Sequence, residues 1–501
     1  MTAVSLLLFQ GAERSMDNQQ IILTSIVAVP VLGACLLPLA GRLSVPLRNW
    51  LSLALVLVPL VLSCALLPAI MAGERITVSS DFLFGANALF RADGLAVFMG
   101  IVSSLISAII VLYSTDYISH YGSQNEYYFM VVLFLGAMMG LVFAANLVIL
   151  YLFWEITAIA SWRLIGFFRE KPHVLRADKA FLVTFLGAVV MLLGFIALYA
   201  QTGTFDMAEI HSQGVTASGL VAALILVGIL SKSATLPFHT WLPDAGVAPS
   251  PVTALLHAAV LVKIGVYVFA RLFLATMSLS AGWMEAVMII AAASALVSAA
   301  AALIETDLKR IIAYSTVSQI AFIFLGFATW VPGNSAAEIG VTGALLYILM
   351  HGLAKGGLFL CAGIVEQNTH TKDITRMGGL IRSMPVTAIS FLFCSFSVMG
   401  IPPFGGFFSK YMVMSGAAQN APLWITLTFL VGAFLTIIYL FRVFNLVFLG
   451  ESRLGEVKER SPVMVTCVAG LAVLSLVAGF AIAMPSGFAQ MAASQMLGIT
   501  R

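Results

Sequence analysis

"SKSATLPFHTWLPDAGVAPSPVTALLHAAVLVK", residues 231–263, places lysines, histidines and prolines in the middle of an otherwise apolar chain. Of the 501 residues, 61% are hydrophobic and 9% are charged, and the mean hydropathy is +1.05. Because soluble domains carry about 25% charged residues, this composition indicates an integral membrane protein. The net charge of +3 is too small to favour nucleic acid as a partner. The stretch 231–263 therefore places ammonium groups and helix breakers where a bilayer penalises both.

The apolar runs have the length of membrane-spanning helices, which need about 20 residues each. We predict an all-α polytopic membrane protein with about fourteen transmembrane helices. The predicted spans are 21–40, 50–71, 94–115, 127–145, 147–168, 178–200, 219–245, 251–273, 283–304, 307–330, 338–366, 385–417, 422–449 and 462–484. The mixed stretch 72–92 is expected at the surface. The first twenty residues lack a basic start followed by a long apolar core, so we expect no cleaved signal peptide.

Lysine and arginine in the connections predict the orientation, because cytoplasmic loops are enriched in both. The connections after odd-numbered spans hold fourteen such residues: Arg42, Arg48, Arg169, Lys171, Arg176, Lys179, Lys309, Arg310, Lys372, Arg376, Arg382, Arg453, Lys458 and Arg460. The connections after even-numbered spans hold three, Arg75, Arg91 and Arg271. Odd-numbered loops are therefore expected in the cytoplasm and both termini on the outer side.

The seventh and twelfth predicted spans are interrupted by helix breakers. These are Pro237 and Pro243 in "ATLPFHTWLPDAG", and Pro402, Pro403, Gly405 and Gly406 in "MGIPPFGGFFSK". Paired broken helices at corresponding positions point to an inverted-repeat transporter. The breaks are five spans apart, and an odd offset makes the two five-helix units face opposite ways. The predicted domains are a three-helix segment 1–126, a first repeat 127–273, a second repeat 283–449 and a C-terminal part 450–501.

Ionisable residues within the spans are the candidate functional groups, since charges at membrane depth are costly. They are Glu155, Lys232, His257, Lys263, His351, Lys355 and Lys410. A buried lysine holds its proton more firmly beside a carboxylate than alone, so separating Glu155 from Lys232 would release that proton. Histidine exchanges protons near neutral pH with little tuning. Together these groups favour a proton path.

Each position also has a structural interpretation. A lysine within a span can reach the membrane surface or donate to a backbone carbonyl, a histidine can satisfy a carbonyl, and Glu155 with Lys232 can be a static pair. Arg163 lies nearer the cytoplasmic end of its span, where a structural or headgroup role is favoured over transport. The number of such groups in different spans is what favours a path.

We expect no metal, cofactor or catalytic residues in this chain. The five cysteines, Cys35, Cys64, Cys361, Cys394 and Cys467, fall in apolar segments without a CxxC spacing, so disulfides, zinc and iron–sulfur clusters are not predicted. No nucleotide-binding motif is present, so redox chemistry would have to occur in partner subunits.

Several blocks of the chain resemble the antiporter-like proton-translocating subunits of respiratory complex I, group 4 membrane-bound hydrogenases and Mrp sodium/proton antiporters. The blocks are "FWEITAIASWRLIGF", "KSATLPFHTWLPDAGVAPSPVTALLHAAVLVKIGVYVFAR", "DLKRIIAYSTVSQIAFI", "HGLAKGGLFL", "DITRMGGL" and "GIPPFGGFFSK", in the family's order, within residues 90–450. The resemblance implies fourteen helices with two inverted five-helix repeats. Arg163 departs from the usual neutral residue of its block.

The resemblance also implies residue roles. Glu155 matches the ion-pair glutamate of the fifth helix, and Lys232 matches the lysine of the broken seventh helix. His257 and Lys263 match the connecting groups of the eighth helix, Lys355 matches the lysine of the eleventh, and Lys410 the terminal exchange residue of the twelfth.

From this we predict a proton-translocating membrane subunit of a multi-subunit oxidoreductase, either a complex I-like NADH–quinone oxidoreductase or a membrane-bound hydrogenase. Protons would enter near Lys232 from the cytoplasm and leave through Lys410. The alternative is a subunit of an Mrp-type antiporter, which also carries sodium, and a third possibility is a membrane scaffold. The expected partners are other membrane subunits and the lipid bilayer, in a bacterial or archaeal plasma membrane.

Overall fold

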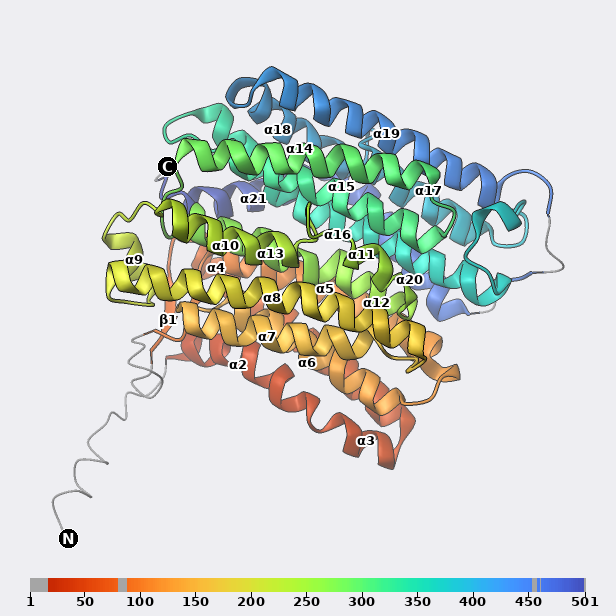
Figure 1. The fold of residues 1–501 in the computed structure, drawn as a ribbon. Helices are drawn as coiled ribbons and strands as arrows, with labels where there is room; N and C mark the ends of the chain where they lie inside the picture. Colours follow the sequence, from red (N-terminus) through yellow and green to blue (C-terminus); the bar gives the residue numbers. More distant parts are fainter. Residues whose placement is uncertain (1–16, 80–87, 453–456, 460, 500–501) are drawn as a thin grey trace, which may run out of the picture.

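A computed structural model describes residues 17–79, 88–452, 457–459 and 461–499. Within these ranges the chain is a bundle of helices, and the prediction of an all-α polytopic membrane protein is confirmed (Figure 1). The described strands, β1 (Ile76–Val78) and β2 (Phe90–Ala92), pair antiparallel with Ile76 opposite Ala92. They lie in the stretch that was expected at the surface. The first sixteen residues, on which the signal-peptide expectation rests, lie outside the described ranges, as do Arg453 and Arg460.

Eleven stretches of the described chain are helical, long and apolar enough to cross a membrane. They are α4 (Val45–Met71), α5 (Gly94–Tyr117, continuing to His120), α6 (Gln124–Val142), α7 (Leu147–Ile165), α8 (Lys171–Thr202), Ser250–Phe273, α14 (Ala281–Ile304), α15 (Leu308–Ala328), α16 (Ser335–Thr369), α19 (Leu423–Phe448) and α20 (Pro462–Phe480). A twelfth is reached if α2 (Asn18–Ala34) and α3 (Leu37–Leu43), bent by 49°, form one span. The count of fourteen thus stays a prediction. Two predicted spans, 219–245 and 385–417, contain the shorter apolar helices α10 (Gly219–Lys232) and α17 (Pro385–Met399). These are the two spans in which we predicted breaks.

The helices divide into buried and peripheral ones. The segment Ser250–Phe273, α15 and α16 are almost wholly enclosed, whereas α4, α8, α19 and α20 expose much of their surface (Figure 1). Small residues allow close packing in the interior: a Cβ atom on Gly416 would lie 2.7 Å from the Cα atom of Gly340. This contact brings α16 against α18 (Gly405–Asn420), the helix that carries Lys410.

The two predicted breaks are present, with a correction. Helix α10 ends at Lys232, and Pro237 lies in the non-helical stretch before α11 (Trp241–Asp244). Pro243 lies inside α11 and is not part of the break. In the second break, Pro402 and Pro403 separate α17 from α18, and Gly405 and Gly406 begin α18.

A third irregularity was not predicted. The expected continuous span 251–273 is divided into α12 (Ser250–Ala254), the π-helix η3 (Leu255–Ala259) and α13 (Leu261–Phe273). Neither proline nor glycine marks this point in the sequence. Single π-helical turns are frequent at functional sites, and His257 lies in the middle of this one.

An ion-pair network fixes the far end of the first break. The Asp244 carboxylate on α11 accepts hydrogen bonds from Lys179 on α8 and Arg310 on α15, both at 2.7 Å. Arg310 also pairs with Glu305 at 2.8 Å. Burial alone would raise the pKa of Glu305, but hydrogen bonds from Arg310 and from the backbone outweigh it and hold the pKa below its usual range. The network ties the first predicted repeat to the second.

Candidate ion-translocation site

Glu155 and Lys232 lie near each other at the first break. Lys232 is fully buried at the end of α10, and its ammonium group donates to the Trp154 carbonyl on α7 at 3.3 Å. The same ammonium group lies 5.2 Å from the centre of the Trp154 ring. Glu155 follows Trp154 directly, is partly exposed, and leaves one carboxylate oxygen buried without a hydrogen-bond partner. The two groups are electrostatic neighbours, but Lys232 donates to a backbone carbonyl.

Lys263 occupies the centre of the bundle. Its ammonium group donates to the Ala258 carbonyl within η3 and to the Ile348 carbonyl on α16, the latter at 2.8 Å. Gly352 on α16 makes room for it, because a Cβ atom there would lie 2.6 Å from the Lys263 nitrogen. The π-helical turn and this glycine together let a lysine enter the interface between two buried helices.

His257 and His351 lie between the lysines. Both are fully buried, and all four ring nitrogens lack a hydrogen-bond partner within the described chain. The His351 ring has Lys263, Lys355, His257 and Lys410 as electrostatic neighbours. Buried polar atoms without protein partners are normally satisfied by water. The histidines therefore mark where water would enter the interior.

Lys355 and Lys410 lie on α16 and α18. Lys355 donates to the Ile312 carbonyl at 3.1 Å and to the Ser315 hydroxyl at 2.6 Å, both on α15. Lys410 donates to the Val398 carbonyl at 2.6 Å, just before the second break. Its nitrogen lies 4.7 Å from the centre of the Phe322 ring and 5.5 Å from that of Tyr347. The second break thus supplies a carbonyl to Lys410, much as the π-turn supplies one to Lys263.

A cavity of about 910 Å³ opens at the lysine-rich ends of the helices. Lys309 and Glu366 line it and form an ion pair at 2.9 Å, with Lys309 almost fully buried. Ser250 donates to Glu366 at 3.3 Å. His257 lies seven residues further along the same segment, about two helical turns away. Neither Lys309 nor Glu366 was among the predicted site residues, because both lie at helix ends, where sequence alone suggests a solvated charge.

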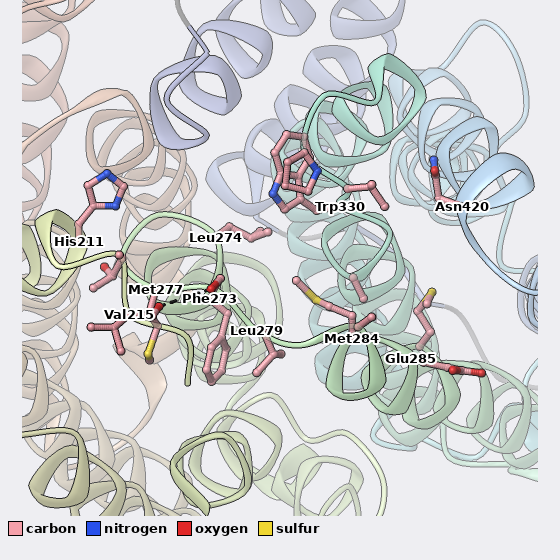
Figure 2. Close-up of a pocket in the computed structure, with 18 of the residues that line it drawn as sticks. His211, Val215, Phe273, Leu274, Met277, Leu279, Met284, Glu285, Trp330 and Asn420 are labelled. Atoms are coloured by element: carbon pink, nitrogen blue, oxygen red, sulfur yellow. Dashed lines mark hydrogen bonds between the residues drawn. The ribbon is translucent and has the colours of Figure 1, made fainter. Parts of the chain in front are cut away.

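A second cavity, of about 670 Å³, lies at the opposite end of α15 and is mostly apolar. Figure 2 shows Phe273, Leu279 and Met284 in its interior, and His211, Glu285 and Asn420 at its margins. Among the described residues that line it, none belongs to the predicted path. Its lining offers few groups that exchange ions.

Arg163 is paired away from the path. It forms an ion pair with Glu126, which also pairs with Arg169 at 2.5 Å. This geometry fits the structural role expected for Arg163.

The five cysteines are all free. Among the described residues, no cluster of three or more His, Cys, Asp or Glu side chains is placed to hold a metal ion.

Comparison with known proteins gives related sequences. The chain is 33% identical over 491 residues to the Na(+)/H(+) antiporter subunit A1 of Staphylococcus saprophyticus, which covers 92% of this chain and 61% of the relative. It is 31% identical over 483 residues to the Na(+)/H(+) antiporter subunit A1 of Staphylococcus aureus, covering 90% of this chain and 60% of that protein. This chain therefore spans about 60% of the length of these relatives.

Solved structures share the fold. A chain of the Mrp complex from Dietzia sp. DQ12-45-1b aligns with a TM-score of 0.88 at 21% identity, covering 97% of this chain and 98% of the other. A chain of the membrane-bound sulfane sulfur reductase, an archaeal respiratory membrane complex, aligns with a TM-score of 0.86 at 22% identity, covering 95% and 98%. The family described as "NADH:quinone oxidoreductase/Mrp antiporter, TM" matches residues 144–436, more than half of the chain. The chain thus belongs to the membrane-subunit family of NADH:quinone oxidoreductases and Mrp antiporters.

Proposed function

We propose that this chain is an ion-translocating subunit of a multi-subunit sodium/proton antiporter of the Mrp type. The observation that carries this proposal is the 33% identity over 491 residues to a Na(+)/H(+) antiporter subunit A1. The comparisons favour this alternative over the oxidoreductase subunit that we preferred from the sequence.

The transported proton would pass through groups that can accept and donate it. Glu155 and Lys232 form the uptake end at the first break, and Lys410 forms the release end at the second. Between them lie Lys263, His351, His257 and Lys355, all fully buried. In support of this order, His351 has three of the lysines as electrostatic neighbours, and its ring nitrogens, which lack a partner among the described residues, could bind water that connects them.

The surface of α7 supports an assembly. Leu152 and Ile159 are each 51% exposed, and Glu155 lies on the same face of the helix, partly exposed. A carboxylate facing hydrocarbon near mid-span is costly. A neighbouring membrane subunit would cover this face and shield Glu155 from lipid.

The second candidate is the respiratory subunit of our sequence prediction. The likeness of the fold to the membrane-bound sulfane sulfur reductase favours it. In both cases the chain would lie in a prokaryotic plasma membrane with its lysine-rich loops in the cytoplasm and its termini outside. The two candidates differ in what drives transport, which is an ion gradient in one and electron transfer in the other.

The test uses the complete complex in everted membrane vesicles without an electron donor. A pH-sensitive dye reports proton movement when sodium is added. The wild-type complex is expected to exchange sodium for protons, and Lys232→Met to lower the rate about 100-fold, within the range that proton-transfer groups contribute. Glu155→Gln should have a similar effect. Lys171→Met, at an exposed lysine on α8, is the control and should retain the full rate.

Three outcomes separate the hypotheses. Normal assembly with an unchanged exchange rate in Lys232→Met and Glu155→Gln would support the scaffold and exclude the transport role. A wild-type complex that moves protons only when an electron donor is supplied would replace the antiporter with the respiratory subunit. Sodium-dependent exchange that is lost in both variants would support the proposal.

A further inference from the structure

A chain of side-chain hydrogen bonds runs between the surroundings of Lys355 and Lys410. The Ser315 hydroxyl accepts from Lys355 and from the Tyr439 hydroxyl, both at 2.6 Å. Tyr439 also reaches Thr436 at 3.4 Å. These groups come from α15, α16 and α19, so the contacts exist only in the folded bundle.

The second half of the chain leads to Lys410. The Gln319 amide nitrogen donates to Thr436 at 3.2 Å, and the Gln319 amide oxygen accepts from the Tyr347 hydroxyl at 2.6 Å. The Tyr347 ring is one of the two aromatic faces beside the Lys410 nitrogen. Ser315, Gln319, Tyr347, Thr436 and Tyr439 are all fully buried.

From this arrangement we propose that Ser315 and Tyr439 are positioning residues that stabilise Lys355 in both its protonated and its neutral form. The proposal rests on the proposed function, because it assumes that Lys355 gives up and regains a proton. It adds two residues that the sequence did not single out as functional, although Ser315 lies in the block "DLKRIIAYSTVSQIAFI".

The chemistry of the hydroxyl groups supports this role. A charged lysine only donates hydrogen bonds, whereas a neutral amine also needs a donor for its lone pair. With Lys355 charged, Ser315 accepts from both neighbours, and no hydrogen bond to another described residue fixes its own hydrogen. With Lys355 neutral, the Ser315 hydroxyl can rotate to donate to the amine while it still accepts from Tyr439. A backbone carbonyl such as that of Ile312 accepts from either form, but it has no hydrogen to donate to the lone pair of the neutral amine.

The remaining members form a fixed link. The Thr436 hydroxyl donates to the Gly432 carbonyl at 2.8 Å and accepts from the Gln319 amide at 3.2 Å. The Tyr439 hydroxyl lies 3.4 Å from Thr436, but its single hydrogen goes to Ser315. Gln319 donates through nitrogen and accepts through oxygen, and these roles cannot be exchanged by rotating a hydroxyl. This half of the chain therefore orients Tyr347 beside Lys410 and carries no proton itself.

The experiment compares two pairs of variants in the assembled complex. Ser315→Ala is matched by Ser318→Ala, on the same helix, where a fully buried hydroxyl donates to the Ala295 carbonyl. Tyr439→Phe is matched by Tyr113→Phe, where a fully buried hydroxyl donates to the Leu360 carbonyl. Native gels give the amount of assembled complex, and the maximal exchange rate and the half-saturating sodium concentration are measured per complex.

We expect Ser315→Ala to lower the maximal rate about tenfold, because Lys355 loses a hydrogen bond of its charged group. Tyr439→Phe should lower it about tenfold as well, because it removes the hydrogen bond that orients the Ser315 hydroxyl. The half-saturating sodium concentration should not change, since neither residue is proposed to bind sodium. The two controls should stay within about twofold of the wild type. A purely structural role would reduce the amount of complex and leave the rate per complex intact.

The proposal is overturned if each variant and its control have the same rate per complex while Lys232→Met remains inactive. That result leaves the proposed function standing. If the wild type exchanges no sodium, the antiporter function fails, and the four variants are then compared by donor-driven proton uptake. In that assay, a proton-uptake rate about tenfold below that of the controls supports the role of Ser315 and Tyr439, and a rate equal to that of the controls overturns it.

Discussion

Gly352→Ala tests whether Lys263 must occupy the space beside α16. The added Cβ atom would lie 2.6 Å from the Lys263 nitrogen and 2.5 Å from the Cδ1 atom of Ile106. It would also lie 3.1 Å from the Ala258 carbonyl oxygen, which accepts from Lys263. The side chains of Lys263 and Ile106 are both fully buried. Lys263 would have to leave at least one of its two carbonyl acceptors.

Opposing contributions determine the free-energy penalty of Gly352→Ala. Replacing glycine by alanine within a helix stabilises it by about 1 kcal/mol. Losing one hydrogen bond of a charged group costs about 1.5–3 kcal/mol, and overpacking a dense core costs about 1–3 kcal/mol. The net penalty is therefore about 1.5–5 kcal/mol against the arrangement with Lys263 in place. Since about 1.4 kcal/mol corresponds to a factor of ten, exchange should fall at least about tenfold.

Gly356→Ala is the matched control, one turn further along α16. A Cβ atom there would meet its nearest neighbours at 3.4, 3.6 and 3.7 Å, which are ordinary contacts. We expect this variant to retain the wild-type rate and to be slightly more stable. Sodium-driven proton exchange per assembled complex is the assay. Wild-type exchange in Gly352→Ala, or equal losses in the two variants, would refute the reasoning.

Two further predictions concern charged groups near the helix ends. Asp93→Asn removes the carboxylate that binds Arg271 at 2.5 and 2.8 Å; it leaves a buried guanidinium unpaired and should cost about 3–5 kcal/mol, seen as a lower melting temperature of the complex. Burial alone would raise the pKa of Asp93, but Arg271 outweighs it and holds the pKa below its usual value of 3.8. The stabilisation is thus fully present above pH 3.8 and is lost as the pH falls through the folded-state pKa; a melting temperature of Asp93→Asn equal to that of the wild type at neutral pH would contradict this. Asp244→Asn removes two partly exposed ion pairs and should cost only about 1 kcal/mol of stability. A larger drop in melting temperature for Asp244→Asn than for Asp93→Asn would contradict the expectation that the buried pair contributes more.

The sequence was sufficient for the class of fold and for finding most of the ionisable groups that the fold buries, while their role in transport stays a prediction. The thickness of the bilayer sets the length of an apolar run that crosses it, so membrane-spanning helices can be recognised from the sequence alone. Proline and glycine mark non-helical backbone, so both broken helices were predicted. Lysines such as Lys232 and Lys410 stand out because a charge in an apolar run is rare. Pro243 was misassigned because proline is tolerated in the first turn of a helix.

The sequence by itself determined which ionisable residues lie within the apolar spans and that two of those spans are broken, because both follow from local composition. Only the tertiary structure decided what those charges contact. No helix-breaking residue marks the π-turn at His257, and only the fold shows that Lys263 joins this turn to α16 by donating to the Ala258 and Ile348 carbonyls. The partners of Lys355 come from helices far apart in sequence, and neutral serine and tyrosine side chains resemble ordinary core residues until the fold brings them together. Whether a side chain can ionise is a property of the residue, whereas its hydrogen-bond partners are a property of the packed bundle.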